Sequence, residues 1–213
     1  MAVLSDTQVI AAMNSGRIII SPFIRGHLSN CSYDVTLGAE FYRANIEVKM
    51  LNPWSKTHID TFWGSLQTAS VATEVEAKDI GLQVGDKYIC LHPGEMILGH
   101  TQEFIGGLSD ITTMMKARSS IGRCCLSVCK CAGMGDIGYI SRWTMEITNH
   151  STTAKIILPV GKRIAQIVFL TSSEPEKPYT GNYQTGTTTQ EIMAAWQPSD
   201  MLPKLYKEKV PGV

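Results

Sequence analysis

Residues 142–148 read Arg-Trp-Thr-Met-Glu-Ile-Thr, and this stretch indicates how the chain folds. Trp143, Met145 and Ile147 alternate with polar residues, which is the period of a β-strand that has one buried face. Further short runs rich in valine and isoleucine recur along the chain, together with 18 glycines and 9 prolines. The sequence therefore predicts mostly β structure with frequent turns.

Glu146 lies on the polar face of this expected strand, between Thr144 and Thr148. A carboxylate in that position either meets solvent or lines a pocket. The alternation alone leaves both interpretations open.

A second stretch upstream combines hydroxyl and guanidinium groups. It reads Arg118-Ser119-Ser120-Ile121-Gly122-Arg123. The planar fork of arginine suits phosphate oxygens, and small residues beside glycine let backbone N–H groups approach an anion. A solvated basic loop is the alternative interpretation.

The composition limits the class of protein. A chain of 213 residues is long enough for one compact domain with a sizeable core. Lysine plus arginine equals aspartate plus glutamate at 19 each, so the net charge is zero. This balance argues against a nucleic-acid-coating surface or an anionic-membrane patch. We find no secretory signal and no apolar stretch near the ~20 residues that span a bilayer, so we expect a cytoplasmic protein.

Four of the six cysteines lie close together in the sequence. This cluster is Cys124, Cys125, Cys129 and Cys131, and the other two are Cys31 and Cys90. We expect them to be reduced in the cytoplasm. The cluster lacks a paired Cys-x-x-Cys, and a strand would point Cys124 away from the other three. We therefore interpret these cysteines as small buried hydrophobes rather than zinc ligands, and we expect no metal site formed by the protein.

Helix signals are few. A short helix is expected from Leu4 to Gly16, started by Ser5 or Asp6 and closed by Gly16. A second is expected at residues 189–196. Residues 45–84 show no sustained period and suggest an irregular excursion with short strands.

Strand signals continue on both sides of residue 142. Residues 88–101 read as a hairpin turned at Pro93-Gly94. Other strands are expected at residues 17–20, 125–131, 155–158 and 163–170.

Read together, these motifs resemble the dCTP deaminase and dUTPase superfamily. The most specific part is the spacing from Ser119-Ser120-x-x-Arg123, through Ala132-Gly133-x-x-Asp136 and Tyr139, to Glu146. The resemblance implies a distorted jelly-roll-like, dUTPase-type β-barrel with a few short helices. It also implies a homotrimer with sites between subunits. It covers a domain of residues 1–186 and leaves residues 187–213 as a C-terminal tail with a short helix.

The resemblance assigns the nucleotide contacts residue by residue. Arg118, Ser119 and Ser120 match positions that hold the triphosphate, usually with Mg²⁺ bound through it. Ala132 matches a position whose backbone carbonyl reads the exocyclic amine of the base. The remaining matches are Gln166 near the phosphates, Asp136 and Tyr139 at the deoxyribose, Tyr179 near the sugar, and Gln184 in a Lys-Tyr-Gln motif. Asn182 replaces the lysine of that motif, and Gln166 could equally be a hydrogen-bonded core amide.

Glu146 distinguishes two branches of the family, because dUTPases generally have an apolar residue there. A single carboxylate can take a proton from the water that attacks C4 of cytosine and deliver it to the departing amine. The resemblance places Arg123 and Ser119 beside this water. The zinc-deaminase signature, His-x-Glu followed by Pro-Cys-x-x-Cys, is absent from the sequence.

The resemblance predicts a dCTP deaminase that releases dUTP and ammonia and so feeds dUMP and dTTP synthesis. Three alternatives stay open: a bifunctional enzyme that forms dUMP, a dUTPase, and a non-catalytic nucleotide-binding regulator. The resemblance makes dTTP a possible inhibitor, because one segment of the family moves during feedback inhibition. In this chain that segment reads Cys129-Lys130-Cys131 and departs from the family pattern. Inhibition by dTTP therefore does not follow for this chain.

Overall fold

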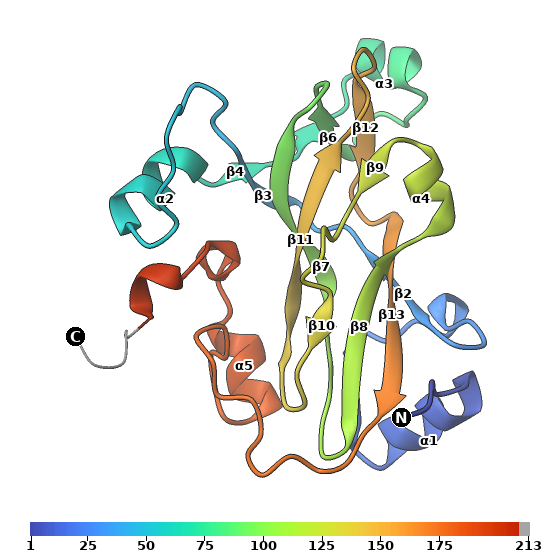
Figure 1. The fold of residues 1–213 in the computed structure, drawn as a ribbon. Helices are drawn as coiled ribbons and strands as arrows, with labels where there is room; N and C mark the ends of the chain where they lie inside the picture. The colour runs from blue at the N-terminus through green and yellow to red at the C-terminus, as the bar shows by residue number, and fades with distance from the viewer. Residues whose placement is uncertain (209–213) are drawn as a thin grey trace.

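The computed structural model describes residues 1–208 and shows three antiparallel sheets (Figure 1). The strand order is β4-β3-β7-β11-β9 in the largest sheet, with β1 also paired to β7. The other sheets have the orders β10-β8-β13-β2 and β12-β6-β5. The predicted mainly β fold is confirmed.

The strands are β1 (Ile18–Ser21), β2 (Tyr33–Thr36), β3 (Glu40–Arg43), β4 (Gln67–Thr68), β5 (Ser70–Val71), β6 (Lys87–Leu91), β7 (Met96–Gly107), β8 (Ile111–Ala117), β9 (Leu126–Ser127), β10 (Met134–Gly135), β11 (Ile140–Asn149), β12 (Ile156–Pro159) and β13 (Arg163–Thr171). The α-helices are α1 (Asp6–Asn14), α2 (Lys56–Trp63), α3 (Glu74–Ile80), α4 (Ser119–Arg123) and α5 (Thr189–Ala195). Short 3₁₀ turns are η1 (Arg25–His27), η2 (Pro198–Met201) and η3 (Leu205–Lys207).

Strand β11 has the alternation that the sequence predicts. Trp143, Met145 and Ile147 are buried in the main core, whereas Thr144 and Glu146 are half-buried. The strand pairs with β7 along most of its length, and the register shifts between Arg142 and Thr144. Glu146 therefore faces the same side of the sheet as its cross-strand neighbour, Leu98.

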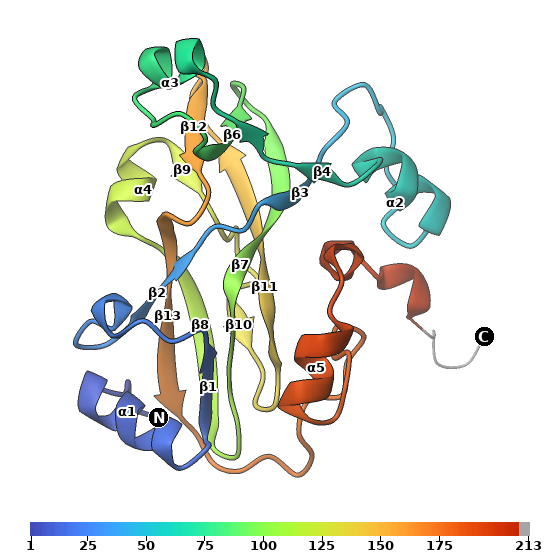
Figure 2. The ribbon, with the colours of Figure 1, turned by 180° about the vertical axis from the view of Figure 1, so that it is seen from behind.

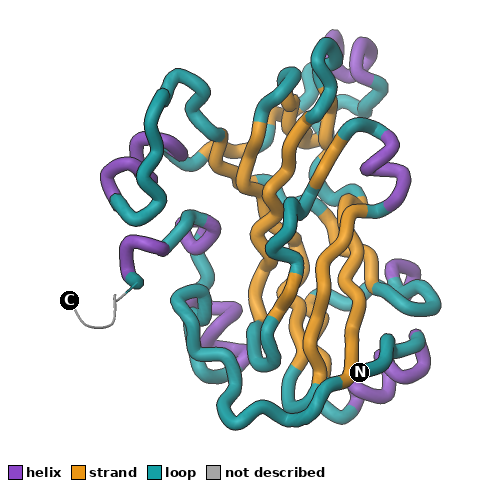
Figure 3. Tube along the Cα trace, viewed as in Figure 1, coloured by secondary structure: helices purple, strands orange, loops and turns teal. Residues whose placement is uncertain are grey.

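The helices lie around the edges of the strands (Figure 3). Helix α1 begins as expected, because Ser5 and Gln8 form a capping box, and Gly16 follows the helix at a φ of +73°. Helix α5 confirms the expected short helix in the tail. Seen from behind, α2 and the tail lie on the same side of the sheets, and α4 lies on the other (Figure 2).

Two expectations for local structure are wrong, and a third is incomplete. The turn at Pro93-Gly94 does not join a hairpin, since β6 pairs with β12 and β5 while β7 pairs with strands of the largest sheet. Residues 45–84 contain the expected short strands, β4 and β5, but also two helices, α2 and α3, in which Ser55 and Thr73 act as N-caps. Only Leu126–Ser127 of the expected strand at residues 125–131 is extended in a sheet.

The expected burial of the cysteines is also wrong for most of them. Cys31, Cys124, Cys125 and Cys131 are exposed, and only Cys90 and Cys129 are partly covered. Residues 124–131 form a turn, the two-residue strand β9 and a loop instead of one long core strand, and Cys124, Cys125 and Cys131 meet solvent.

Within residues 1–208, no helix is both long and apolar enough to cross a membrane. Across the same residues, no group of three or more His, Cys, Asp or Glu side chains is placed to hold a metal ion.

A substitution at Gly106 tests the close pairing of β7 with β11. A Cβ atom at this position would lie 2.0 Å from the carbonyl oxygen of Tyr139. Because that neighbour is backbone, we expect Gly106→Ala to lower the free energy of unfolding by about 1–3 kcal/mol. Urea denaturation at fixed protein concentration measures the change.

Gly26→Ala is the matched control, because a Cβ atom there meets nothing within 4 Å. We expect it to change the free energy of unfolding by less than about 0.5 kcal/mol. Equal stability of the two variants would contradict the close strand approach.

Candidate functional site

A cavity of about 440 Å³ opens between β11, the loop that contains β10, and the C-terminal tail. Its lining combines polar, aromatic and apolar side chains. The lining residues are Leu98, Ala132, Met134, Asp136, Tyr139, Trp143, Thr144, Glu146, Tyr179, Tyr183, Met201, Pro203 and Leu205. Five of the residues singled out by the sequence thus meet in one cavity, namely Ala132, Asp136, Tyr139, Glu146 and Tyr179.

Glu146 enters the cavity from the middle of β11. The backbone N–H of Lys130 donates a hydrogen bond to Glu146 Oε2 at 3.0 Å. The loop between β9 and β10 is thereby tied to the carboxylate, and Ala132 follows two residues later. This contact holds one carboxylate oxygen in place within a half-buried setting.

Three aromatic rings, from Tyr139, Trp143 and Tyr179, form one end of the cavity. The ring centroid of Tyr139 lies 5.6 Å from that of Trp143 and 5.3 Å from that of Tyr179, both in edge-on geometry. Burial raises the pKa of Tyr139 to about 12, although its hydrogen bond with Ser141 acts in the opposite direction. The Tyr139 hydroxyl is therefore a neutral donor at physiological pH.

Strand β10 positions Asp136 at the cavity. Met134 and Gly135 pair with Met114 and Thr113 of β8. A Cβ atom at Gly135 would collide with the Trp143 ring and the Thr113 hydroxyl, so glycine allows the strand to lie this close to β11. Asp136 follows directly and is exposed to the cavity.

Gln184 does not line the cavity but supports it. Its Nε2 donates to the carbonyl oxygen of Gly138 at 3.2 Å. Its Oε1 is buried and has no hydrogen-bond partner within residues 1–208. A buried acceptor left in this state is costly unless a ligand or water satisfies it.

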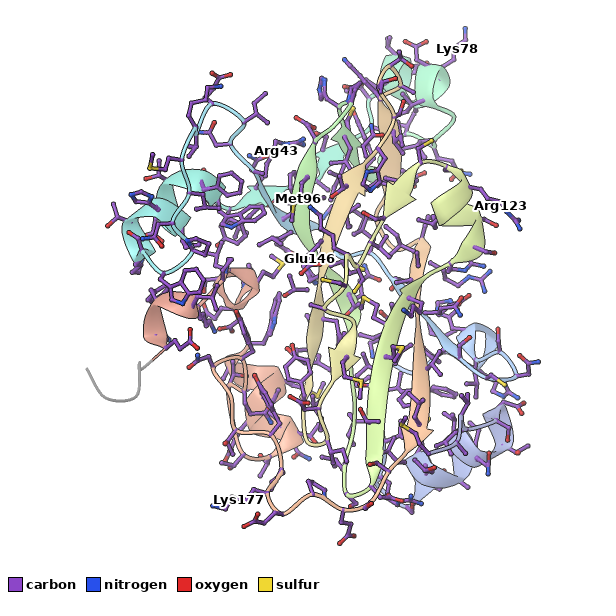
Figure 4. All side chains as sticks on the ribbon, viewed as in Figure 1. Arg43, Lys78, Met96, Arg123, Glu146 and Lys177 are labelled. Atoms are coloured by element: carbon purple, nitrogen blue, oxygen red, sulfur yellow. The ribbon has the colours of Figure 1, made fainter. Side chains whose placement is uncertain are left out.

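A second group of predicted residues lies outside this cavity. Arg118, Ser119, Ser120 and Arg123 belong to α4 or its N-cap, and none of them is a lining residue. Figure 4 shows Arg123 projecting outward from α4, away from Glu146. One chain therefore does not bring Ser119 and Arg123 to the Glu146 carboxylate.

An ion-pair cluster anchors this second group. Arg118 Nε lies 3.1 Å from Asp34 Oδ2, and Arg163 Nη1 lies 3.2 Å from the same oxygen. The side chain of Asp34 is 8% exposed. Asp34 lies on strand β2, and its carboxylate holds two guanidinium groups in place.

Gln166 belongs to this basic side of the molecule. In β13 it pairs in register with Asp34 of β2 and Lys116 of β8, so the three side chains share one face of the sheet. Gln166 is half-buried. It therefore lies with Arg118 rather than with Glu146.

Cys129 lies near the carboxylate of Glu146. Burial raises the pKa of the Cys129 thiol, and the charge of Glu146 acts in the same direction. The thiol is neutral at physiological pH and is a poor nucleophile in that form.

The sequence did not predict an apolar wall of the cavity, which we define as Leu98, Met201, Pro203 and Leu205. Three of these residues, Met201, Pro203 and Leu205, come from the C-terminal tail. The available signal was weak: four of the five residues from 201 to 205 are apolar, Lys204 being the exception.

Comparison with known proteins places the chain in a family. The family described as dCTP deaminase-like matches residues 3–172. A dUMP-forming dCTP deaminase of Methanosphaera stadtmanae is 31% identical over 182 residues, covering 84% of each chain. A dCTP deaminase of Natronomonas pharaonis is 31% identical over 183 residues, covering 83% of this chain and 85% of the relative.

A solved structure supports the fold. The crystal structure of 2'-deoxycytidine 5'-triphosphate deaminase from Agrobacterium tumefaciens superposes with a TM-score of 0.54 at 19% identity. The match covers 78% of this chain and 47% of that chain, so it shows a shared fold over about half of the larger protein. The sequence match to most of the chain, with this shared fold, establishes that the protein belongs to the dCTP deaminase-like family.

Proposed function

We propose that the protein deaminates dCTP to dUTP and ammonia, with Glu146 as general base and proton shuttle. The observation that carries this proposal is the cavity in which Glu146 meets Ala132, Asp136, Tyr139 and Tyr179. Curated relatives named dCTP deaminases support it. A cavity of about 440 Å³ has room for a nucleoside.

The proposed chemistry uses water and one carboxylate. Glu146 takes a proton from water as the oxygen forms a bond to C4 of cytosine, and the proton then passes to the exocyclic nitrogen. The C4–N bond breaks and ammonia leaves, the proton of the remaining hydroxyl group passes to N3, and C4 keeps the oxygen as the carbonyl of uracil. The hydrogen bond from Lys130 holds Glu146 Oε2, so the proton in this scheme moves on Oε1. Glu146 supplies the proton transfers without zinc.

We propose that Ala132 binds the base, Asp136 and Tyr139 bind the deoxyribose, and Tyr179 closes the sugar side. Gln184 supports this arrangement by donating to the carbonyl oxygen of Gly138, the residue before Tyr139. The role of Tyr139 fits a neutral hydroxyl packed between aromatic rings.

We further propose that Arg118, Ser119, Ser120 and Gln166 hold the triphosphate. The carboxylate beside Arg118, Asp34, is already paired with two guanidinium groups. These residues therefore suit phosphate oxygens better than a bare metal ion, and Mg²⁺ would enter bound to the triphosphate and offset its charge.

The separation of the two residue groups supports an active site shared between subunits of a homotrimer. Glu146 faces the cavity on one side, while Arg123 projects outward from α4 (Figure 4). In the proposed trimer, Ser119 and Arg123 of a neighbouring subunit complete the cavity, position the water and stabilise the developing hydroxide.

A second candidate function is the bifunctional reaction that continues to dUMP and pyrophosphate. Relatives from Methanosphaera stadtmanae, Methanococcus vannielii and Halobacterium salinarum are named dUMP-forming. Asp136 opens onto the same cavity as Glu146, so one bound nucleotide could meet both carboxylates. Inhibition by dTTP is not part of this proposal, because residues 129–131 depart from the family pattern.

The glutamate variant Glu146→Gln tests the proposed base. An amide cannot accept the proton from water, so we expect the rate of ammonia release from dCTP to fall by roughly 10²–10⁴-fold. Incubation with dCTP and magnesium, followed by an ammonia assay and separation of dUTP and dUMP, measures both reactions.

Glu47→Gln is the control, because Glu47 is an exposed glutamate outside the cavity, and it should keep wild-type rates. Undiminished ammonia release by Glu146→Gln would remove Glu146 from the proposed role. A wild type that releases no ammonia but cleaves dUTP would move the protein to the dUTPase branch.

Mixed trimers test the shared site. We expect Glu146→Gln and Arg123→Ala each to be inactive alone. In every mixed trimer one of the three interfaces joins an intact Glu146 to an intact Arg123, so we expect about one third of wild-type activity in doubly tagged, co-purified mixtures. The mass in solution should be three times the 23.4 kDa of the chain.

Homotrimers of each single variant, prepared with the same two tags, serve as controls. Mixed trimers as inactive as these homotrimers would show that both residues act within one subunit. A monomeric wild type that deaminates dCTP would show the same.

A further inference from the structure

The tail after the family match returns to the cavity instead of leaving the molecule. The dCTP deaminase-like match ends at residue 172, yet Met201, Pro203 and Leu205 line the cavity that contains Glu146. These residues supply much of its apolar wall. Three sets of contacts hold the tail there.

The first contact is made by Trp196, which follows α5. Its ring lies 5.0 Å from the ring of His100 and meets the ring of Phe104 edge-on at 6.3 Å. The guanidinium carbon of Arg142 lies 5.1 Å from the Phe104 centroid and 5.2 Å from the Trp196 centroid. Arg142 is therefore held between two aromatic rings and fixes the tail to β11.

The second contact is made by Lys204. Its Nζ lies 2.9 Å from Asp200 Oδ1, donates to the carbonyl oxygen of Asn182 at 3.1 Å, and lies 5.1 Å from the Tyr183 ring centroid. Its backbone N–H donates to the Tyr183 hydroxyl at 3.1 Å. The tail is thus bound to Tyr183, which itself lines the cavity.

The third contact buries Met201 in a small core. Met201 is 3% exposed and packs in a cluster with Tyr42, Leu98 and the α2 residues Ile59 and Trp63. The tail and the excursion at residues 45–84 meet in this cluster, beside the α2 helix visible in Figure 1. Met201 is therefore set in a fixed place, with Leu98 beside it.

Leu98 connects this cluster to the part of the cavity where the proposed cytosine base would lie. Leu98 is the cross-strand neighbour of Glu146, so both side chains face the cavity from adjacent strands. Cytosine has a polar edge of O2, N3 and the amine and an apolar edge of C5 and C6. Side chains without hydrogen-bonding groups match the apolar edge, because a polar edge against them would lose its hydrogen bonds.

We infer that Met201, together with Leu98, forms the specificity-determining wall at C5 of the pyrimidine. This inference rests on the proposed function, which places C4 at Glu146. C5 is bonded to C4, so it meets the apolar residues that adjoin Glu146. The bulk of Met201 then sets how large a substituent on C5 the cavity admits.

Equilibrium binding of dCTP and 5-methyl-dCTP is measured by calorimetry with magnesium on the full-length protein carrying Glu146→Gln, so that dCTP is not consumed. Each variant below is made in this background, and the ratio for Glu146→Gln alone serves as the wild-type ratio of the wall. Met201→Ala removes bulk at C5, so we expect the affinity ratio to shift toward 5-methyl-dCTP by about tenfold. Leu205→Ala removes an exposed part of the wall at little structural cost and should shift the ratio in the same direction by less.

Leu202→Ala is the matched control. Leu202 is the next residue and packs against the same cluster, but it does not line the cavity. Its affinity ratio should equal that of the wild type. A wild-type ratio in both Met201→Ala and Leu205→Ala, or an equal shift in Leu202→Ala, would overturn the inference.

Ammonia release by the wild type is measured in parallel. It distinguishes failure of the C5 wall from failure of the proposed function. A wild type that binds and deaminates dCTP, with unchanged ratios in the variants, would refute only the C5 wall. A wild type that binds neither nucleotide would refute the proposed function and the inference with it.

Discussion

The pairing of β7 with β11 is the constraint on which the cavity depends. Its register sets Glu146 beside Leu98, one polar and one apolar side chain on the same face. A slip of one residue would turn Glu146 into the core and Met145 toward the cavity, because strand side chains alternate. The close approach at Gly106 and the hydrogen bond from the Trp143 backbone N–H to the Thr101 hydroxyl hold this register on both sides of the shift after Arg142.

The cavity has two halves of different origin. The polar half comes from β10, β11 and their loops, which lie inside the family match, and it offers Asp136, Glu146 and the Tyr139 hydroxyl. The apolar half comes largely from the tail, held by Trp196, Met201 and Lys204. In the proposed arrangement, substitutions in the tail can change which base is accepted without moving Glu146 on β11 or Asp136 after β10. The residues of α4 that we propose to bind the triphosphate are a third element, which is positioned by the ion pair of Arg118 with Asp34 and not by the cavity.

Local patterns were sufficient to predict the strand at Glu146 and the capped helix α1, because both depend on periodicity or on cap residues within a short segment. The grouping of Ala132, Asp136 and Tyr139 was implied by the resemblance to the family and not by these patterns. The pairing of β6 could not be read in this way, since the turn at Pro93-Gly94 fits a hairpin equally well and long-range contacts decide the partner. The apolar wall was missed for the same reason: Leu98 and Met201 are distant in sequence, and only tertiary packing shows that they meet. The exposed cysteines show that composition alone does not determine burial.

A crystal structure of Glu146→Gln with dCTP and magnesium would test the central claim most directly. We expect C4 of cytosine beside residue 146, C5 against Leu98 and Met201, and the triphosphate on Arg118, Ser119 and Ser120 of a neighbouring subunit. A base bound outside the cavity, or a triphosphate held by the chain that holds the base, would contradict the proposed arrangement.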